Sequence, residues 1–342
     1  MFRKIIFNIS LLLVVMTASA QDINFSQFYE LPLLRNPALA GNFRGDIRAT
    51  AAFRNQWASA AGVPFRTQAL GIELKSGVSE NSDDYKVFGL QLTNDQAGDS
   101  KMGKTQILPS FSFQKSLSDM RNSYLAIGAI GGVIQQRFDP SGLKWADQFV
   151  NGEYSETNPT QQVFSRTSMT YWDFSMGLLY SGEFGRDIRY YVGAAGFHLF
   201  QPKVSFNPDN NFKLNRKYLF NAGLSAPTSP DDRVIIYLDA FMQGGNRQAQ
   251  GGFIYKHDIV EADNDETLSI SAGSFLRWGD AIIPVVKLDM YKLAVGLTYD
   301  VNISKLTVAS KMRGGFEVTV SYHDFLNIRN SSSQKLRCPV SL

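Results

Sequence analysis

The stretch FEVTVSYH, residues 316–323, alternates strictly between apolar and polar side chains. In an extended chain, successive side chains point to opposite faces, so this pattern predicts a β-strand with one apolar and one polar surface. The apolar surface would carry Phe316, Val318, Val320 and Tyr322.

The stretch YKLAVGLTYD, residues 291–300, repeats this design and places tyrosine at both ends of its apolar face. Strands that cross a bilayer have aromatic rings at the two interfaces and aliphatic side chains between them. Near residue 47 the polar face carries charges that, in a membrane strand, require a watery lumen. The residues of this polar face are Asp46, Arg48, Thr50 and Arg54, of which Asp46, Arg48 and Arg54 are charged.

Similar segments, separated by turn-forming residues, recur along the chain and predict about 14 strands. They are expected near residues 46–54, 67–74, 86–93, 106–115, 123–137, 171–180, 188–199, 218–226, 233–242, 249–257, 267–276, 282–288, 291–300 and 315–323. If both ends of the chain are periplasmic, odd-numbered connections are outer loops, and most of these are longer than the turns between them. Two of them, near 243–248 and 277–281, are short.

We therefore expect an all-β fold, a transmembrane antiparallel β-barrel of the outer-membrane type. A bilayer offers no water to backbone amides, so strands that span it must close into a barrel. A secreted β-sandwich or propeller also has alternating strands, although no fixed-period repeat typical of a propeller is present.

The start of the chain has the composition of a secretory signal peptide. Arg3 and Lys4 precede an apolar run, and Ala18-Ser19-Ala20 provides the small residues of a cleavage site. We expect four regions: a signal peptide at 1–20, an N-terminal extended segment at 21–45, a barrel at 46–325 and a polar tail at 326–342.

Composition excludes several classes of function. The hydrophobic content of 44% is enough for a folded core, and one cysteine, Cys338, allows no intramolecular disulfide. The formal charge is +3, and a leader with two basic and no acidic residues lowers it to about +1 in the mature chain. A nucleic-acid partner is not indicated.

No motif of catalysis, metal binding or cofactor binding is recognisable. His198, His257 and His323 lie on different predicted strands without the spacing of a zinc site. The acidic run at 261–266 lacks the glycine and the distal glutamate of a calcium loop, and is interpreted as a solvated turn. We predict no enzyme and no cofactor.

Residues 23–41, INFSQFYELPLLRNPALAG, do not have the pattern of a helix or a strand. They resemble the N-terminal signature of the PorP/SprF family of type IX secretion and gliding-motility membrane proteins of the Bacteroidota. The likeness continues through Arg54-Asn55-Gln56-Trp57, Gly89-Leu90, the stretch 128–138, Gly315-Phe316-Glu317 and Cys338-Pro339, but the chain ends in Val340-Ser341-Leu342 where an aromatic residue commonly closes.

This resemblance implies an outer-membrane barrel whose partners are a large secreted or surface adhesin, cargo with a type B C-terminal signal, periplasmic type IX components and outer-membrane lipid. The residues expected to bind a partner or to plug the lumen are Phe25, Ser26, Gln27, Tyr29, Asn36, Pro37, Gly41, Arg54, Gln56 and Trp57. Pro32 and Pro37 favour extended or turn conformations, so this segment is expected along the lumen wall or below the periplasmic mouth. It is alternatively a simple lead-in to the first strand.

Two other functions remain open on the sequence alone. A porin-like channel or a transporter of hydrophobic compounds would use the same kind of barrel with a lumen that conducts. A soluble, extracellular lectin-like protein would use the alternating strands in a sandwich.

Overall fold

The computed structural model describes residues 22–56, 63–118, 122–150, 152–185, 187–261, 267–304, 313–328 and 330–334. The expected signal peptide, Trp57 and Cys338 lie outside these residues. Among the residues described, no helix has both the length and the apolar composition that crossing a membrane requires.

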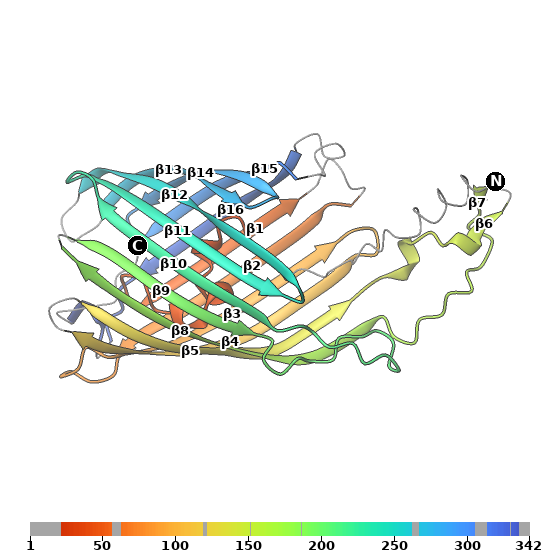
Figure 1. The fold of residues 1–342 in the computed structure, drawn as a ribbon, viewed down its shortest axis with the longest axis horizontal. Helices are drawn as coiled ribbons and strands as arrows, with labels where there is room; N and C mark the ends of the chain where they lie inside the picture. Colours follow the sequence, from red (N-terminus) through yellow and green to blue (C-terminus); the bar gives the residue numbers. More distant parts are fainter. Residues whose placement is uncertain are drawn as a thin grey trace, which may run out of the picture.

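Fourteen antiparallel strands form a closed barrel, which confirms the predicted fold (Figure 1). Each strand pairs with its neighbours in the chain, and β1 pairs with β16 to close the cylinder, with Ile47 opposite Asp324. The strands are β1 (Ile47–Gln56), β2 (Phe65–Gly77), β3 (Tyr85–Ala97), β4 (Met102–Ser118), β5 (Ser123–Arg137), β8 (Ser168–Phe184), β9 (Ile188–Phe197), β10 (Lys217–Pro227), β11 (Asp232–Gln243), β12 (Asn246–Glu261), β13 (Thr267–Arg277), β14 (Ala281–Met290), β15 (Leu293–Asn302) and β16 (Arg313–Asp324).

Each predicted strand corresponds to one of these, and most of the observed strands are longer. For example, β4 extends well beyond the expected 106–115 at both ends.

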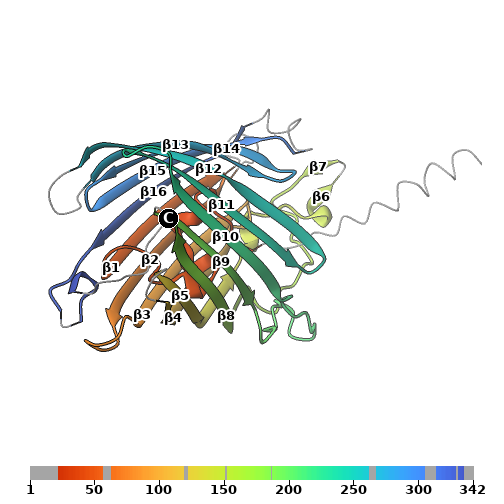
Figure 2. The ribbon, with the colours of Figure 1, turned by 60° about the vertical axis from the view of Figure 1, so that its left-hand side comes forward.

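Connections at the two ends of the barrel differ in length. We call the end where β1 begins and β16 ends the turn end, and the opposite end the loop end. The connections 138–167 and 198–216 extend from the loop end (Figures 1 and 2). The former contains two short helices, η3 (Pro140–Gly142) and η4 (Ala146–Gln148), and the two-stranded sheet of β6 (Phe149–Val150) and β7 (Glu153–Tyr154).

The two faces of the wall have opposite chemistry. Outward positions carry large exposed apolar side chains, including Leu70, Phe88, Phe111, Leu178, Phe220, Leu238, Leu297 and Val320. Inward positions carry buried polar and charged ones, including Thr50, Arg54, Glu73, Gln91, Asn221, Asp239, Arg277, Asp300 and Glu317. An apolar exterior suits lipid, and the buried polar groups require partners inside the barrel.

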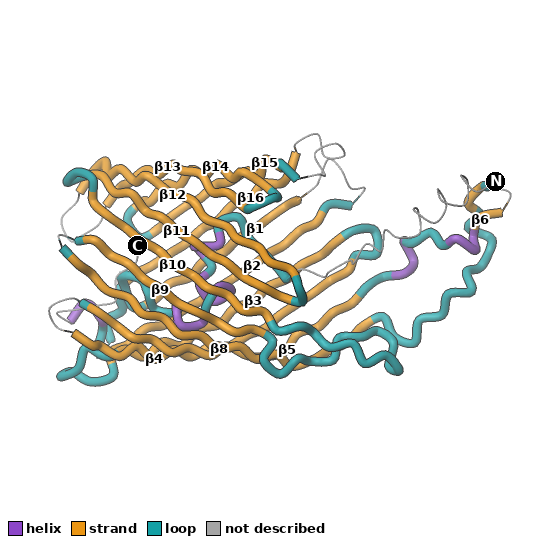
Figure 3. Tube along the Cα trace, viewed as in Figure 1, coloured by secondary structure: helices purple, strands orange, loops and turns teal. Residues whose placement is uncertain are grey.

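Those partners come from residues 22–46, which we call the lumen segment, because they lie inside the barrel (Figure 3). The segment forms three short helices: η1 (Phe28–Glu30), α2 (Pro32–Arg35) and η2 (Pro37–Leu39). Of the expected extended or turn conformations, the segment adopts turns, each closed into a short helix. Pro32 and Pro37 each occupy the first position of a helix, where the missing N–H costs nothing and the fixed φ favours the helix.

Candidate functional site: the lumen segment and the barrel wall

The loop-end half of the lumen segment binds two carboxylates of the wall. The backbone N–H groups of Ser26 and Gln27 both donate to Glu317 on β16, each at 2.7 Å. The Ser26 hydroxyl donates to Asp300 on β15 at 2.5 Å. The Gln27 side chain accepts from Thr319 at 2.8 Å, so this wall fixes both backbone and side chains of the segment.

Two arginines balance these carboxylates. Arg54 on β1 lies 2.6 Å from Asp300 and 3.7 Å from Glu317, and it also donates to the carbonyl oxygen of Asn24. Arg277 on β13 lies 3.2 Å from Asp300 and donates to the Ser26 hydroxyl at 3.0 Å. These wall charges are almost fully buried, so each depends on the others and on the lumen segment for compensation.

A second ionic contact holds the first described residue. Asp22 lies 2.8 Å from Lys104 on β4 and 3.6 Å from Lys217 on β10, and three strands separate β4 from β10 in the barrel. His198, just after β9, binds Asp173 at 2.6 Å and lies 3.5 Å from Asp22. Burial opposes the charge on the imidazole, but the interactions with the two aspartates outweigh it and raise the pKa of His198 to about 9.

In the middle of the lumen, Arg35 forms a bidentate ion pair with Asp239 on β11, at 2.9 and 2.5 Å. The guanidinium also lies over the ring of Phe28, 4.9 Å from its centroid. Next to Phe28, the ring of Tyr29 stacks on the ring of Tyr237, with 5.0 Å between the two ring centroids. A planar cation with a fork of donors fits both a carboxylate and an aromatic face, which positions helix α2 against the wall.

Asn36 is fully buried and joins the lumen segment to a different part of the wall. Its side-chain oxygen caps helix η2 by accepting from the N–H of Ala38 at 2.9 Å. Its amide nitrogen donates to the carbonyl of Leu178 at 3.0 Å and to Asn221 at 3.1 Å.

Glycines in the wall make room for this contact. A Cβ at Gly177 would lie 1.8 Å from the Asn36 oxygen, and one at Gly128 would lie 2.3 Å from the carbonyl carbon of Pro37. Backbone of the lumen segment therefore approaches backbone of β5 closely, which only glycine permits.

The turn-end half of the lumen segment is also attached to the wall. Gly41, at φ +77°, donates its N–H to Glu73 on β2 at 2.9 Å. A Cβ there would lie 2.4 Å from Val87, so both conformation and space require glycine. The carbonyl of Phe43 accepts from the ammonium of Lys75, which also lies 4.7 Å from the centre of the Phe43 ring.

Asp46, the last residue of the lumen segment, binds the chain that follows the barrel. Its carboxylate accepts from the N–H of Leu326 at 2.9 Å and from the N–H of Ser332 at 2.7 Å, and also from the hydroxyl of Ser331. The exit of the lumen segment and the start of the C-terminal tail are thus joined at the turn end.

The structure brings most of the predicted site residues together in the lumen. Phe25 is buried against Leu31 and Ala52. Gln56 lies at the loop end of β1 opposite Gly315, and Trp57 is not among the described residues. Arg54 belongs to the wall itself and contacts the lumen segment at Asn24. The predicted residues that contact the wall from the lumen are Phe25, Ser26, Gln27, Tyr29, Asn36, Pro37 and Gly41.

Sequence reasoning missed their partners on the wall. Asp239 and Arg277 each follow an apolar residue within a strand, and Glu73 lies between Ile72 and Leu74. An isolated charge in an apolar strand indicates an inward position, but nothing in the sequence identifies which charge meets which residue of the segment.

Below the lumen segment, a cavity of about 550 Å³ opens at the turn end. Its lining mixes both signs of charge, and the charges are paired: Lys287 lies 2.7 Å from Glu30, and Arg189 lies 2.7 Å from Asp187. Among the described residues, no group of histidine, cysteine, aspartate and glutamate side chains is arranged to hold a metal ion.

Comparison with solved structures finds other large barrels. The toluene transporter TbuX of Ralstonia pickettii is 10% identical with a TM-score of 0.48, and the alignment covers 86% of this chain and 92% of that one. The monoaromatic hydrocarbon channel CymD is 9% identical with a TM-score of 0.45, and the alignment covers 87% of this chain and 94% of that one. BamA of Haemophilus ducreyi, lacking POTRA domains 1–3, is 8% identical with a TM-score of 0.40, and the alignment covers 82% of this chain and 70% of that one. At these identities and TM-scores, the likeness carries no argument about function.

No curated protein matches the sequence. A family profile does: the family described as "Type IX secretion system membrane protein PorP/SprF" matches residues 17–322, which is most of the chain. The closed barrel with an apolar exterior agrees with a membrane protein of this kind. The chain belongs to the PorP/SprF family of type IX secretion system membrane proteins, and it is a β-barrel of the outer membrane.

Proposed function

We propose that this protein is a plugged, non-enzymatic scaffold of the type IX system that anchors a large surface polypeptide, such as an adhesin with a type B C-terminal signal, or helps to export it. The observation that carries the proposal is the lumen segment, which is buried and bound to the wall at both ends of the lumen. A conduit would have to displace all of these contacts, whereas a scaffold keeps them.

The loop end supports contact with a partner at the cell surface. In outer-membrane barrels the long loops are extracellular and the short turns are periplasmic. The loops at 138–167 and 198–216 expose Val163, Phe200 and Phe212 at 91%, 75% and 57%. Exposed apolar side chains that lie beyond the lipid are typical of protein interfaces.

The turn end supports contact with periplasmic type IX components. Its cavity of about 550 Å³ has the lumen segment as its floor and Arg233, Lys256 and Asp258 on its walls. Such a concave, mixed-charge surface suits a polypeptide with complementary side chains better than an ion or a small apolar molecule.

The test measures surface display and conductance on the same variants. Replacement of residues 141–164 by a short Gly-Ser linker is expected to abolish display of the partner in cells, with the barrel still inserted. The matched control replaces residues 98–101, the short loop between β3 and β4, by a Gly-Ser linker of the same length and is expected to retain display.

Conductance separates the scaffold from the porin-like or hydrophobic-compound transporter. In planar bilayers the purified protein is expected to show no steady open pore, and deletion of residues 22–41 is expected to create one. A steady pore in the intact protein, or normal partner display after both loop replacements, would contradict the scaffold role.

A further inference from the structure

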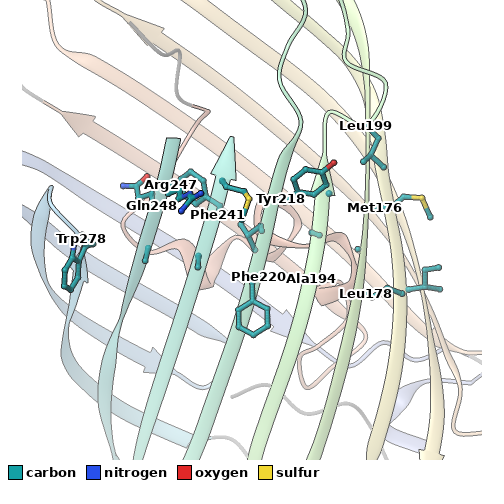
Figure 4. Close-up of a pocket in the computed structure, with 18 residues that line it drawn as sticks. Met176, Leu178, Ala194, Leu199, Tyr218, Phe220, Phe241, Arg247, Gln248 and Trp278 are labelled. Atoms are coloured by element: carbon teal, nitrogen blue, oxygen red, sulfur yellow. The ribbon is translucent and has the colours of Figure 1, made fainter. Parts of the chain in front are cut away.

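An apolar groove crosses the outside of the barrel wall at its loop-end half. Its volume is about 960 Å³, and it spans strands β8 to β12 (Figure 4). Large exposed side chains form its walls, and small residues form its floor. The walls include Met176, Leu178, Tyr218 and Phe220, and the floor includes Ala194, Gly196, Ala240 and Ala249.

The groove arises from the residue sizes on adjacent strands. The outward side chains of β9 become smaller toward the loop end, from Val192 to Ala194 and Gly196. The neighbouring strands β8 and β10 have large outward side chains beside them. Tyr218 pairs with Gly196, so one wall stands directly next to the floor. The small residues on β9 therefore leave a hollow in the outer surface, whereas large residues at these positions would make the surface flat.

Two arginines lie at the loop-end rim of this groove. Arg247 lines it, directly opposite Met242 on β11. Arg216 precedes β10 and donates to the carbonyl of Leu199, another lining residue, at 3.2 Å. Both side chains are exposed, and among the described residues no acidic side chain lies within ion-pair distance of either. Trp278, 76% exposed, lies at the same rim.

We propose that this groove binds a phosphorylated, multiply acylated glycolipid of the outer leaflet, of the lipid A type. The apolar channel accepts acyl chains, and the two arginines at its rim are placed at headgroup level to bind phosphate. Trp278 suits the same interface, where amphipathic rings are enriched. The inference rests on the exterior of the wall and is independent of the proposed scaffold role, which rests on the lumen.

The test measures lipid retained by the purified barrel. The protein is exchanged into phosphatidylethanolamine nanodiscs that contain a small fraction of lipid A or, separately, phosphatidylglycerol, then released into mild detergent and analysed by native mass spectrometry. We expect retained lipid A on the unaltered protein. Loss of two arginine contacts in R216A/R247A is expected to lower retention by about tenfold.

Matched variants distinguish this groove from the rest of the lipid-facing surface. Arg66→Ala removes an exposed arginine near the loop end of β2, on another part of the wall, and is expected to leave retention unchanged. Ala240→Phe fills the floor and is expected to lower it, whereas Ala51→Phe, on an exposed position of β1, is not.

A measurement on the unaltered protein keeps the test valid if a variant fails to fold. Lipid A stripped of its phosphates is expected to be retained far less than intact lipid A. Equal retention of both forms, retention that does not depend on Arg216 and Arg247, or preferred retention of phosphatidylglycerol would each overturn the proposal.

Discussion

Strand β16 shows how differently the two faces of this wall constrain a side chain. Val318 and Val320 face outward, where contact with lipid requires only that a residue be apolar. Glu317 and Thr319, the residues next to them in sequence, face inward and bind particular atoms of the lumen segment at 2.7 and 2.8 Å. The outer face therefore accepts different apolar side chains but no charged one. The inner face requires a particular side chain at each position.

Loss of a buried carboxylate is expected to have the largest effect. Asp300→Ala leaves Arg54 and Arg277 without their shared partner inside the lumen, and should lower the free energy of unfolding by about 3–5 kcal/mol. Urea titration of the barrel refolded in detergent micelles measures this. The matched control is Asp139→Ala, which breaks an exposed pair with Lys101 and should leave the free energy of unfolding nearly unchanged. Equal losses in the two variants would remove the distinction between lumen and surface ion pairs.

A charge on the outer face is expected to be nearly as damaging. Leu297 is exposed on the outer face in the middle of β15, and Leu297→Arg should destabilise the barrel by about 2–4 kcal/mol. Unfolding in lipid vesicles measures the effect, and Leu297→Val serves as the apolar control. Tolerance of arginine at this position would show that the outer face does not contact lipid there.

Because the lumen segment lies close to the wall at Gly128, a larger residue there is expected to lower the stability by an intermediate amount. Gly128→Ala introduces a Cβ against the Pro37 backbone and should cost about 1–3 kcal/mol, with increased protease cleavage within residues 22–46. Gly103→Ala makes the same change on β4, where the nearest side-chain atom would be 3.4 Å away. Similar stability of both variants would show that the segment is not fixed against β5.

Asn36→Ala tests the cap of helix η2 and the contact with Asn221 together. The change removes an N-cap oxygen and a buried amide donor, and should cost about 1–2 kcal/mol. Asn36→Ser restores the capping oxygen alone and should recover part of the loss. Hydrogen exchange of the Ala38 amide reports the cap directly, and unchanged protection in Asn36→Ala would contradict its role.

The smallest losses of stability are expected from two conservative substitutions on β16. Thr319→Val removes the hydrogen bond to Gln27 and should cost about 1 kcal/mol. Val320→Leu keeps an apolar side chain in lipid and should change stability by less than about 0.5 kcal/mol. The comparison fails if the outward substitution proves the more damaging of the two in the same urea titration.

Strand number and facing were predictable from residues 316–323 and similar stretches. The period of two assigns every side chain to one face, and an all-strand membrane span has no stable form other than a closed barrel. The family resemblance likewise identified Ser26, Gln27 and Asn36 as candidates. A position along the lumen wall was one of the predicted alternatives for this segment, but the partners of these residues on the wall were not predictable.

The conformation of residues 22–46 shows why. Pro32 and Pro37 were interpreted as favouring extended or turn conformations, without a choice between them, and each begins a short helix. Helices of three or four residues are not stable alone, so no local signal specifies them. They form because Arg35, Asn36 and Gly41 meet partners on different strands.

The sequence by itself determined a closed membrane barrel, because alternation and the lack of water in lipid act locally and on every strand alike. Only the tertiary structure decided that the lumen is filled by residues 22–46 of the same chain. That outcome depends on buried charges from strands far apart in sequence, such as Arg54 and Asp300, meeting at one place. Such pairings are set by closure of the barrel and not by any neighbouring residue.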